Sequence, residues 1–390
     1  MPETYRQHIR LLIGGNGTAN LKFSHTERCI DTLKEQPMKI LILAGGLSAE
    51  RDVSLTSGCL IAAALIERGH KVCLCDPYTG LDPNGQKPCY TDTAICPHGI
   101  SKQVPDLEEL MRSSGRGERR IAPGVMELCR MADTVFIALH GDVGEDGRLQ
   151  AMLEMENIRH TGSGYVGCLL SMNKDITKRL LRDAFVLTPD WICCSLSKQT
   201  TAAAAEQIEW EIGYPCVVKP CCGGSSIGVS MAENRAQLMQ ALTLARRFEG
   251  DIVAERRIQG RDVTVSILGG RVLPAIEILP HSGFYDYSNK YQAGASDEIC
   301  PADISEAASR SMAEAVKRGF EVLHLGGYAR FDFILDETDK AWCLEANALP
   351  GMTATSLLPR AAAAVGMDYP SLCEEILKLA DKPEGNQPWS

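Results

Sequence analysis

The chain has 390 residues and the composition of an ordinary globular protein, with 45% hydrophobic and 23% charged residues. Its net charge of −10 argues against a dedicated nucleic-acid-binding protein, which would usually carry an excess of basic residues. No stretch approaches the ~20 apolar residues of a membrane span, so we expect neither a nucleic acid nor a membrane as partner.

The N-terminal stretch and the cysteines carry little functional signal. Residues 1–37 are polar and aperiodic and lack the apolar core of an export signal, so we interpret them as a flexible extension or a mis-assigned start. The 16 cysteines show no C-x-x-C spacing, which argues against a metal-binding cysteine cluster. They are interpreted as reduced thiols serving as small apolar residues in a cytoplasmic protein.

Residues 38–161 alternate strand and helix patterns. The run "KILILAGG" predicts a buried strand that ends in glycines, and residues 53–70 predict an amphipathic helix after it. Further strands are predicted at residues 71–76 and 134–141, with a connecting helix around Asp106–Arg112. This βαβ order indicates a Rossmann-like domain whose parallel sheet has a ligand site beyond the carboxyl ends of its strands.

Residues 162–255 begin a second segment with a mixed pattern. Helices are predicted over residues 171–184 and 232–248, and a strand over residues 251–258. Between the helices, "VVKPCCGGSSIGVS" is a short apolar strand that ends at Lys219 and runs into a loop of small residues. We expect this segment to form a central α+β domain.

Residues 256–382 form the third segment, and residues 383–390 are a tail. Its expected elements are a hairpin over residues 262–279 with Gly269 and Gly270 at the turn, a helix over 307–322, a second hairpin and a helix over 369–380. The fold class is therefore α/β, with a βαβ domain followed by two α+β domains around a shared cleft.

The second hairpin has a polar face. The apolar runs "FDFIL" and "AWCLEA" flank the turn-forming "DETDK", and an antiparallel register centred on that turn places Asp332 opposite Glu345. Because side chains alternate, Arg330 and Asn347 share this face, whereas Phe331 and its alternate neighbours point into a core. Carboxylate and amide oxygens suit Mg²⁺. A solvated polar face with a surface ion pair explains the pattern equally well.

Lys219 and the loop after it can be compared with known phosphate-binding motifs. The loop does not match G-x-x-x-x-G-K-[ST], nor G-x-G-x-x-G at the start of a helix. Alone, a lysine beside small residues is more simply a plain turn. Together with the polar hairpin face, it predicts a nucleotide site in which backbone N–H groups contact phosphate oxygens.

Seven motifs in order resemble those of the D-alanine–D-alanine ligases, enzymes of the ATP-grasp fold, over Met38 to about Asp381. They are "GGLSAERDVSLTSG", "LHGDVGEDGRLQ", "HTGSGYVGCLLSMNKDITK", "VVKPCCGGSSIGVS", "FYDYSNKYQ", "RFDFI" and "LEANALPGMTATSLLP". The resemblance implies a cytoplasmic ligase, often dimeric, that joins two D-alanine molecules for peptidoglycan synthesis. It also implies ATP and two Mg²⁺ or Mn²⁺ ions, with a D-alanyl phosphate intermediate.

The resemblance also implies roles for individual residues. The ATP site would comprise Lys174 and Lys219 at the phosphates, the loop with Gly224, Ser226 and Gly228 over them, Glu255 at the adenine and Asp262 at the ribose. The metal ligands would be Asp332, Glu345 and Asn347. Arg330 and the Gly351 N–H would form the oxyanion site.

The substrate residues follow from the same motifs. Glu50 would bind the ammonium of the first D-alanine and join Ser225 and Tyr291 in a hydrogen-bonded triad. The second D-alanine would contact Lys290, Ser356 and Leu357, with His140 in the same cavity. Taken singly, Glu50 is as well explained by a helix N-terminus and His140 by a satisfied strand end.

The sequence departs from the family pattern at the phosphate loop, where Cys222 and Gly223 stand in place of Arg-Glu, and at the adenine pocket, where Arg257 replaces an aromatic residue. Neither change removes a reacting group. An apolar Leu357 beside the second substrate favours a methyl side chain, so we expect D-alanine at both positions. A D-alanine–D-serine or D-alanine–D-lactate ligase is the alternative, and a non-catalytic nucleotide sensor is a more distant one.

Overall fold

The computed structural model describes residues 36–80, 90–93, 105–224, 228–248, 250–281 and 296–380. The predicted extension lies outside the described residues except for its last two positions. So do four predicted site residues: Ser225, Ser226, Lys290 and Tyr291. Within the described part of the chain, no helix combines the length and apolar character needed to cross a membrane.

The first sheet is parallel, as the βαβ pattern predicts. Its strands are ordered β2-β1-β3 (β1 Lys39–Leu43, β2 Lys71–Cys75, β3 Thr134–Ile137). Its helices are α1 Arg51–Glu67, α2 Leu107–Ser114, α3 Val125–Met131 and α4 Arg148–Met155, with a 3₁₀ turn at Asp142–Gly144. Strand β1 is fully buried from Ile40 onward because both faces of a parallel sheet are covered. Helix α1 packs so closely that a Cβ on Gly58 would lie 2.5 Å from that of Ala44.

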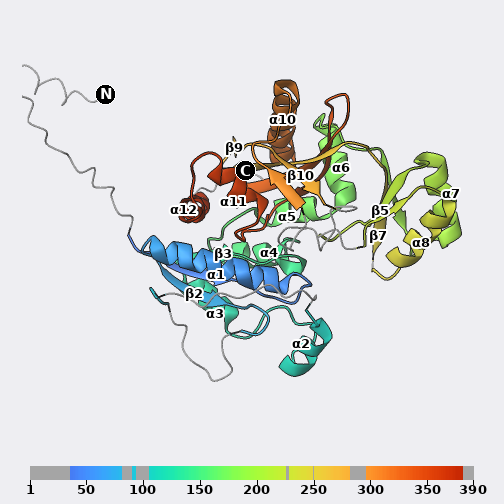
Figure 1. Cartoon of the computed structure of the whole chain (residues 1–390). Helices are drawn as coiled ribbons and strands as arrows, with labels where there is room; N and C mark the ends of the chain where they lie inside the picture. Colours follow the sequence, from blue (N-terminus) through green and yellow to red (C-terminus); the bar gives the residue numbers. More distant parts are fainter. Residues whose placement is uncertain are drawn as a thin grey trace, which may run out of the picture. The chain divides into compact units, whose positions relative to one another are not determined.

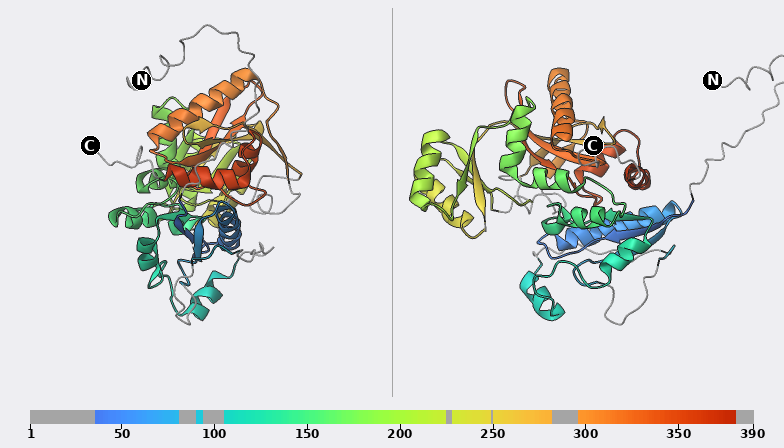
Figure 2. Two further views of the ribbon diagram at one scale, coloured as in Figure 1. Left: turned by 90° about the vertical axis from the view of Figure 1, so that its left-hand side faces the viewer. Right: turned by 180° about the vertical axis from the view of Figure 1, so that it is seen from behind.

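The second sheet is antiparallel, and both of its helices lie on one side of it (Figures 1 and 2). The strand order is β4-β7-β5-β6 (β4 Trp191–Ser195, β5 Cys216–Pro220, β6 Ser230–Ala232, β7 Asp251–Arg256). The covering helices are α7 Thr201–Glu211 and α8 Arg235–Ala245, which share an apolar core with the sheet. The opposite face of the sheet carries polar side chains, among them Lys219 and Glu255.

The third sheet carries the polar hairpin. Its order is β11-β10-β8-β12-β13, with β9 on β8 (β8 Arg261–Leu268, β9 Arg271–Val272, β10 Ile276–Pro280, β11 Ser296–Ile299, β12 Tyr328–Leu335, β13 Ala341–Asn347). Among the described residues of this part of the chain, the helices are α5 Tyr165–Met172, α6 Lys174–Asp183, α10 Glu306–Val322, α11 Leu357–Ala363 and α12 Tyr369–Leu379. Phe331 and Phe333 are buried in a core with Met312 and Val316 of α10. Arg330 and Asp332 alternate with them and occupy the other face.

The predicted pairing of this hairpin is confirmed at the site, and the ladder has a bulge directly beside it. Arg330 pairs with Asn347 and Asp332 with Glu345, as the turn position predicts. The register then shifts, so that Phe333 pairs with Cys343. A bulge inserts one extra residue into one strand and re-aims the side chains beside it. The observed α/β architecture, with one parallel and two antiparallel sheets, confirms the predicted fold class.

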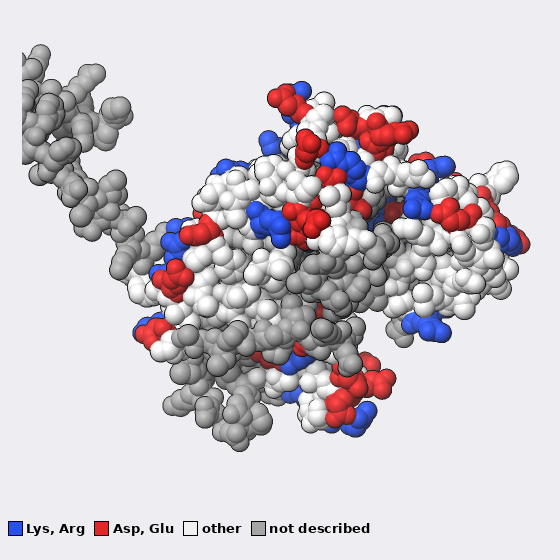
Figure 3. Space-filling view, viewed as in Figure 1, with Lys and Arg blue, Asp and Glu red and all other residues white. Residues whose placement is uncertain are grey.

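Surface charges of both signs are mixed. On the face shown in Figure 3, Lys and Arg side chains stand beside Asp and Glu over the described residues. The absence of a nucleic-acid partner stays a prediction from composition.

Candidate active site

A cavity of about 700 Å³ lies between the polar faces of the two antiparallel sheets. Nine of the predicted site residues line it: Lys174, Lys219, Gly224, Glu255, Asp262, Arg330, Asp332, Glu345 and Leu357. Six further predicted site residues lie in the described part of the chain but do not line the cavity: Glu50, His140, Gly228, Asn347, Gly351 and Ser356. Sheets that present charged groups to a shared concave space form the type of cleft in which small ligands bind.

Asp332 is the centre of the polar hairpin face. Arg330 donates to both of its carboxylate oxygens, from Nε and Nη2 at 2.9 Å each. Asn347 Nδ2 donates to Oδ2 at 3.0 Å, and the buried Thr264 hydroxyl donates to Oδ1 at 2.7 Å. Glu345, opposite in the ladder, has its Oε2 3.8 Å from Lys174 Nζ. The predicted oxygen ligands and two cations therefore converge on one patch.

Thr264 was not predicted from the sequence. It lies on β8 directly opposite Asp332 in the ladder, with 1% of its surface exposed. Finding it requires knowing that β8 and β12 are neighbours, which local patterns do not reveal.

A buried ion-pair network forms the inner wall of the cavity. Glu255 accepts from Lys219 Nζ at 2.6 Å, and its other oxygen lies 2.8 Å from Lys178 Nζ. Burial alone would raise the pKa of Glu255, but the two lysines outweigh it and hold that pKa at about 2. Lys178 is completely buried and also donates to the Thr188 hydroxyl at 2.7 Å. The Lys219 ammonium group and the Glu255 carboxylate are therefore held at fixed positions in the wall of the cavity.

Lys178 is a second residue that the sequence analysis missed. It lies four positions after Lys174 in α6, so both lysines project from the same face of the helix. The four-residue spacing of the two lysines is the sequence pattern from which a role for Lys178 beside Lys174 could have been predicted. Burial lowers the pKa of Lys178, and Glu255 opposes this by favouring the charged form.

Lys174 connects helix α6 to the loop after β5. Its backbone N–H donates to Cys221 O at 2.9 Å, and its Nζ donates to Gly223 O at 2.6 Å. Burial lowers its pKa. Gly228, on the far side of the loop, has φ +77°, and a Cβ there would lie 2.7 Å from the Phe248 ring. The positive φ and the closeness of the Phe248 ring both require glycine at this position.

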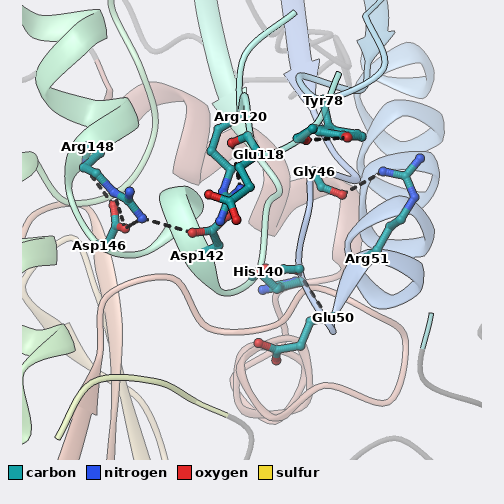
Figure 4. Close-up of polar contacts among 12 residues, drawn as sticks. Gly46, Glu50, Arg51, Tyr78, Glu118, Arg120, His140, Asp142, Asp146 and Arg148 are labelled. Carbon is teal, nitrogen blue, oxygen red and sulfur yellow. Dashed lines mark hydrogen bonds and ion pairs between the residues drawn. The ribbon is translucent and has the colours of Figure 1, made fainter. Parts of the chain in front are cut away.

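Glu50 and His140 lie at the carboxyl end of the parallel sheet (Figure 4). Glu50 precedes α1 and is 7% exposed, and a Cβ on Gly141 would lie only 2.9 Å from its Oε2. A Cβ on Gly224 would lie 3.9 Å from the same oxygen, so Glu50 borders the phosphate loop. His140 Nδ1 lies 3.7 Å from Glu145 Oε1. The other two members of the predicted triad, Ser225 and Tyr291, lie outside the described residues.

Ser356 and Leu357 begin helix α11 at the cavity's edge. Ser356 Oγ accepts from the Thr353 N–H at 2.9 Å, and a Cβ on Gly351 would lie 2.8 Å from the same hydroxyl. Leu357 is 7% exposed and lines the cavity together with Arg330. The structure thus brings Leu357, one of the predicted second-substrate residues, next to the polar hairpin face.

Comparisons with known proteins show which family the chain resembles along its length. The family models described as D-ala D-ala ligase N-terminus and C-terminus match residues 39–163 and 180–378. A curated D-alanine–D-alanine ligase from Nitratidesulfovibrio vulgaris is 37% identical over 345 residues, covering 88% of this chain and 98% of that protein.

Two solved structures are similar at 25% identity and a TM-score of 0.68, each covering 88% of this chain. One is a D-alanine–D-alanine ligase from Bacillus anthracis complexed with ATP, of which 97% is covered. The other is the VanG D-Ala:D-Ser ligase from Enterococcus faecalis, covered completely at 100%.

Proposed function

The chain belongs to the D-alanine–D-alanine ligase family, and we propose from this premise that it joins two D-alanine molecules at the expense of ATP. The product, D-alanyl-D-alanine, would serve peptidoglycan synthesis. The observation that carries the proposal is the cavity in which Lys174, Lys219 and Arg330 face Asp332 and Glu345. Lysine and arginine cations close to metal-binding carboxylates suit the transfer of a phosphoryl group, because that reaction needs its negative charge stabilised.

The reaction proceeds in two steps. A carboxylate oxygen of the first D-alanine attacks the γ-phosphorus of ATP, giving an acyl phosphate and ADP. The amine of the second D-alanine then attacks the acyl carbon, and inorganic phosphate leaves from the tetrahedral intermediate. Lys174 and Lys219 bind phosphate oxygens, and Arg330, held rigidly by Asp332, stabilises the negative charge that develops in both steps. Gly351 N–H would be the second donor to the oxyanion.

Magnesium or manganese fits the donor set of the hairpin face. Asp332, Glu345 and Asn347 offer the hard oxygen ligands that these ions prefer, beside the space that the phosphates would fill. We propose that these three residues hold two ions, which neutralise phosphate charge when bound. Glu255 and Asp262 would contact adenine and ribose. A homodimer and a cytoplasmic location stay predictions from the resemblance.

Replacing Thr264 by valine is expected to raise the Mg²⁺ concentration for half-maximal activity by about 10-fold, because residues that orient metal ligands contribute about 10- to 100-fold to affinity. The hydroxyl donor to Asp332 is lost while the shape of the side chain is retained. Activity is measured against Mg²⁺ concentration at saturating ATP and D-alanine. Thr264→Ser, which keeps the hydroxyl, is the control. An unchanged Mg²⁺ dependence in Thr264→Val would contradict a positioning role.

Replacing Glu50 by glutamine is expected to raise the KM for the first D-alanine by about 10- to 100-fold, since a hydrogen bond to a charged group contributes about 1.5–3 kcal/mol. The variant keeps the size of the side chain and removes its charge. Glu145→Gln is a matched control, because Glu145 also borders Gly224 and His140. A larger effect from Glu145 than from Glu50 would reassign the ammonium site.

The identity of the second substrate is tested by product analysis. Purified protein with ATP and Mg²⁺ is given D-alanine alone, then D-alanine with D-serine or D-lactate, and ADP release and product mass are measured. The apolar Leu357 at the cavity predicts strong turnover on D-alanine alone. Turnover only in the mixtures would favour the alternative, for which the similarity to a D-Ala:D-Ser ligase is the specific observation. ATP binding without ADP release would favour a nucleotide sensor.

A further inference from the structure

Lys178 of α6 is a buried cation that the proposed function leaves without a role. Its side chain is 0% exposed and does not line the cavity, so a ligand in the cavity cannot touch it. Its Nζ lies 2.8 Å from Oε2 of Glu255, which does line the cavity. Any effect of Lys178 on a bound nucleotide must therefore pass through the Glu255 carboxylate.

The surroundings of Lys178 Nζ are those of an ammonium group. Besides Glu255 Oε2, they offer the Thr188 hydroxyl at 2.7 Å and Pro189 O at 3.4 Å. An ammonium has three N–H donors, and a carboxylate or a carbonyl oxygen can only accept. The uncharged Trp191 ring, opposite Glu255 in the β4–β7 ladder, has its centroid 5.4 Å from Nζ, where a cation is favoured. Lys178 is therefore held in its charged form.

The charges around Glu255 are unequal. Its Oε1 lies 2.6 Å from Lys219 Nζ and its Oε2 2.8 Å from Lys178 Nζ, so two ammonium groups share one carboxylate. Lys219 alone would neutralise Glu255, and burying one more charge does not by itself favour folding. Lys219 lines the cavity, and in the proposed function phosphate oxygens draw on its positive charge. The second cation keeps Glu255 balanced while Lys219 serves a phosphate.

The ionisation state of Glu255 decides which group it can bind. An ionised carboxylate only accepts hydrogen bonds, whereas a protonated one also presents an O–H donor. The exocyclic group of adenine is an amino donor, and the equivalent group of guanine is a carbonyl acceptor. Ionised Glu255 therefore favours an amino group at this position of the base and disfavours a carbonyl.

We propose that Lys178 is a positioning residue that keeps Glu255 ionised when a nucleotide phosphate draws on Lys219, and thereby makes the cavity select adenine over a base with a carbonyl in place of the amino group. This inference rests on the proposed function, in which Lys219 binds phosphate and Glu255 contacts the base. Lys178 touches neither base nor phosphate, and it acts on selectivity through Glu255.

Titratable groups from α6, β5 and β13 surround this cluster. Burial by itself would raise the pKa of Glu255, but Lys178 and Lys219 overcome it and hold that pKa at about 2. Lys174 of α6 lies close enough to Lys219 for their positive charges to repel. Burial raises the pKa of the Cys343 thiol of β13, so this neighbour is neutral. Removing Lys178 leaves burial opposed by Lys219 alone, and the pKa of Glu255 must rise.

The test compares the affinities for ATP and for inosine triphosphate (ITP), which carries a carbonyl where ATP carries the amino group. Both are measured by isothermal titration calorimetry with Mg²⁺ and without D-alanine. The ratio of the two dissociation constants cancels the contribution of the phosphates and of Lys219, which both nucleotides share. In the unmodified protein, the ratio should favour ATP equally from about pH 5 to pH 8, well above the folded-state pKa of Glu255. In Lys178→Met, the preference for ATP should fall by about 10-fold toward pH 5, because protonation of Glu255 removes a hydrogen bond to a charged group.

The matched control is the double variant that combines Lys178→Met with Glu255→Gln. A glutamine amide does not titrate, so the preference for ATP should be low and the same at every pH. If Lys178→Met does not fold, Thr188→Val is used, which removes the hydroxyl that accepts from Lys178 Nζ and should give a smaller loss in the same direction. A preference for ATP that is independent of pH in the single variant, or a pH dependence that persists in the double variant, would overturn the proposal. Equal weakening of both nucleotides at every pH, the result expected of a purely structural lysine, would also overturn it.

The binding test is independent of catalysis. An unmodified protein that shows the pH-independent preference for ATP but forms no dipeptide would count against the proposed function alone. A protein that forms the dipeptide, and whose Lys178→Met variant keeps the unmodified selectivity at every pH, would count against this inference alone.

Discussion

Replacing Arg330 by methionine is expected to lower kcat by about 10²–10³-fold, the usual effect of removing one donor that stabilises a developing oxyanion. Arg330 lines the cavity and is oriented by two hydrogen bonds of 2.9 Å to Asp332. A guanidinium fixed in this way needs no reorganisation when negative charge appears. The measurement is kcat at saturating ATP and D-alanine, with a thermal unfolding curve to confirm that the variant is folded.

Arg330→Lys is the matched control for this prediction. It keeps the charge but loses the planar fork that bonds both oxygens of Asp332, so an intermediate kcat is expected. If Arg330→Met retained the kcat of the unmodified protein, Arg330 would have no role in stabilising the reacting groups.

Replacing Glu255 by glutamine is expected to destabilise the protein by about 3–5 kcal/mol, because it leaves buried charges without their partner. Lys178 and Lys219 are 0% and 5% exposed, and both contact this one carboxylate. The free energy of unfolding is measured by urea denaturation. Lys178→Met is the control: it leaves Glu255 paired with Lys219 and should cost less. If Lys178→Met lowered the free energy of unfolding as much as Glu255→Gln or more, Glu255 would not be the centre of the network.

The same network predicts a direction of pH dependence. The folded-state pKa of Glu255 is about 2, below its ordinary value of 4.5. A carboxylate with a lowered pKa contributes stability that is fully present above the ordinary value and is lost as the pH falls through the folded one. The stability difference between the unmodified protein and Glu255→Gln should therefore be constant above about pH 5 and shrink toward pH 2.

The residues that the sequence predicts well are those set by local periodicity. Asp332 and Glu345 fall opposite each other because a turn fixes the register and side chains alternate along both strands. The register shift after Asp332 escaped prediction, since no glycine or other special residue marks it.

Other features depend on which strands become neighbours. Thr264 reaches Asp332 only because β8 lies beside β12 in the third sheet. Sequence periodicity fixes the faces of each strand but not the order of strands in a sheet. Motif resemblance placed Glu50 in the site, and its closeness to Gly224 is a long-range contact that only the fold provides.

The central claim is that a D-alanine carboxylate is phosphorylated by ATP in the cavity that Lys219, Arg330 and Asp332 line. The most direct measurement follows ¹⁸O from carboxyl-labelled D-alanine during turnover with unlabelled ATP. An acyl phosphate requires that one ¹⁸O appear in inorganic phosphate for each dipeptide formed, because the oxygen that bonds to phosphorus leaves with it. Dipeptide formed with no ¹⁸O in the phosphate would contradict the mechanism.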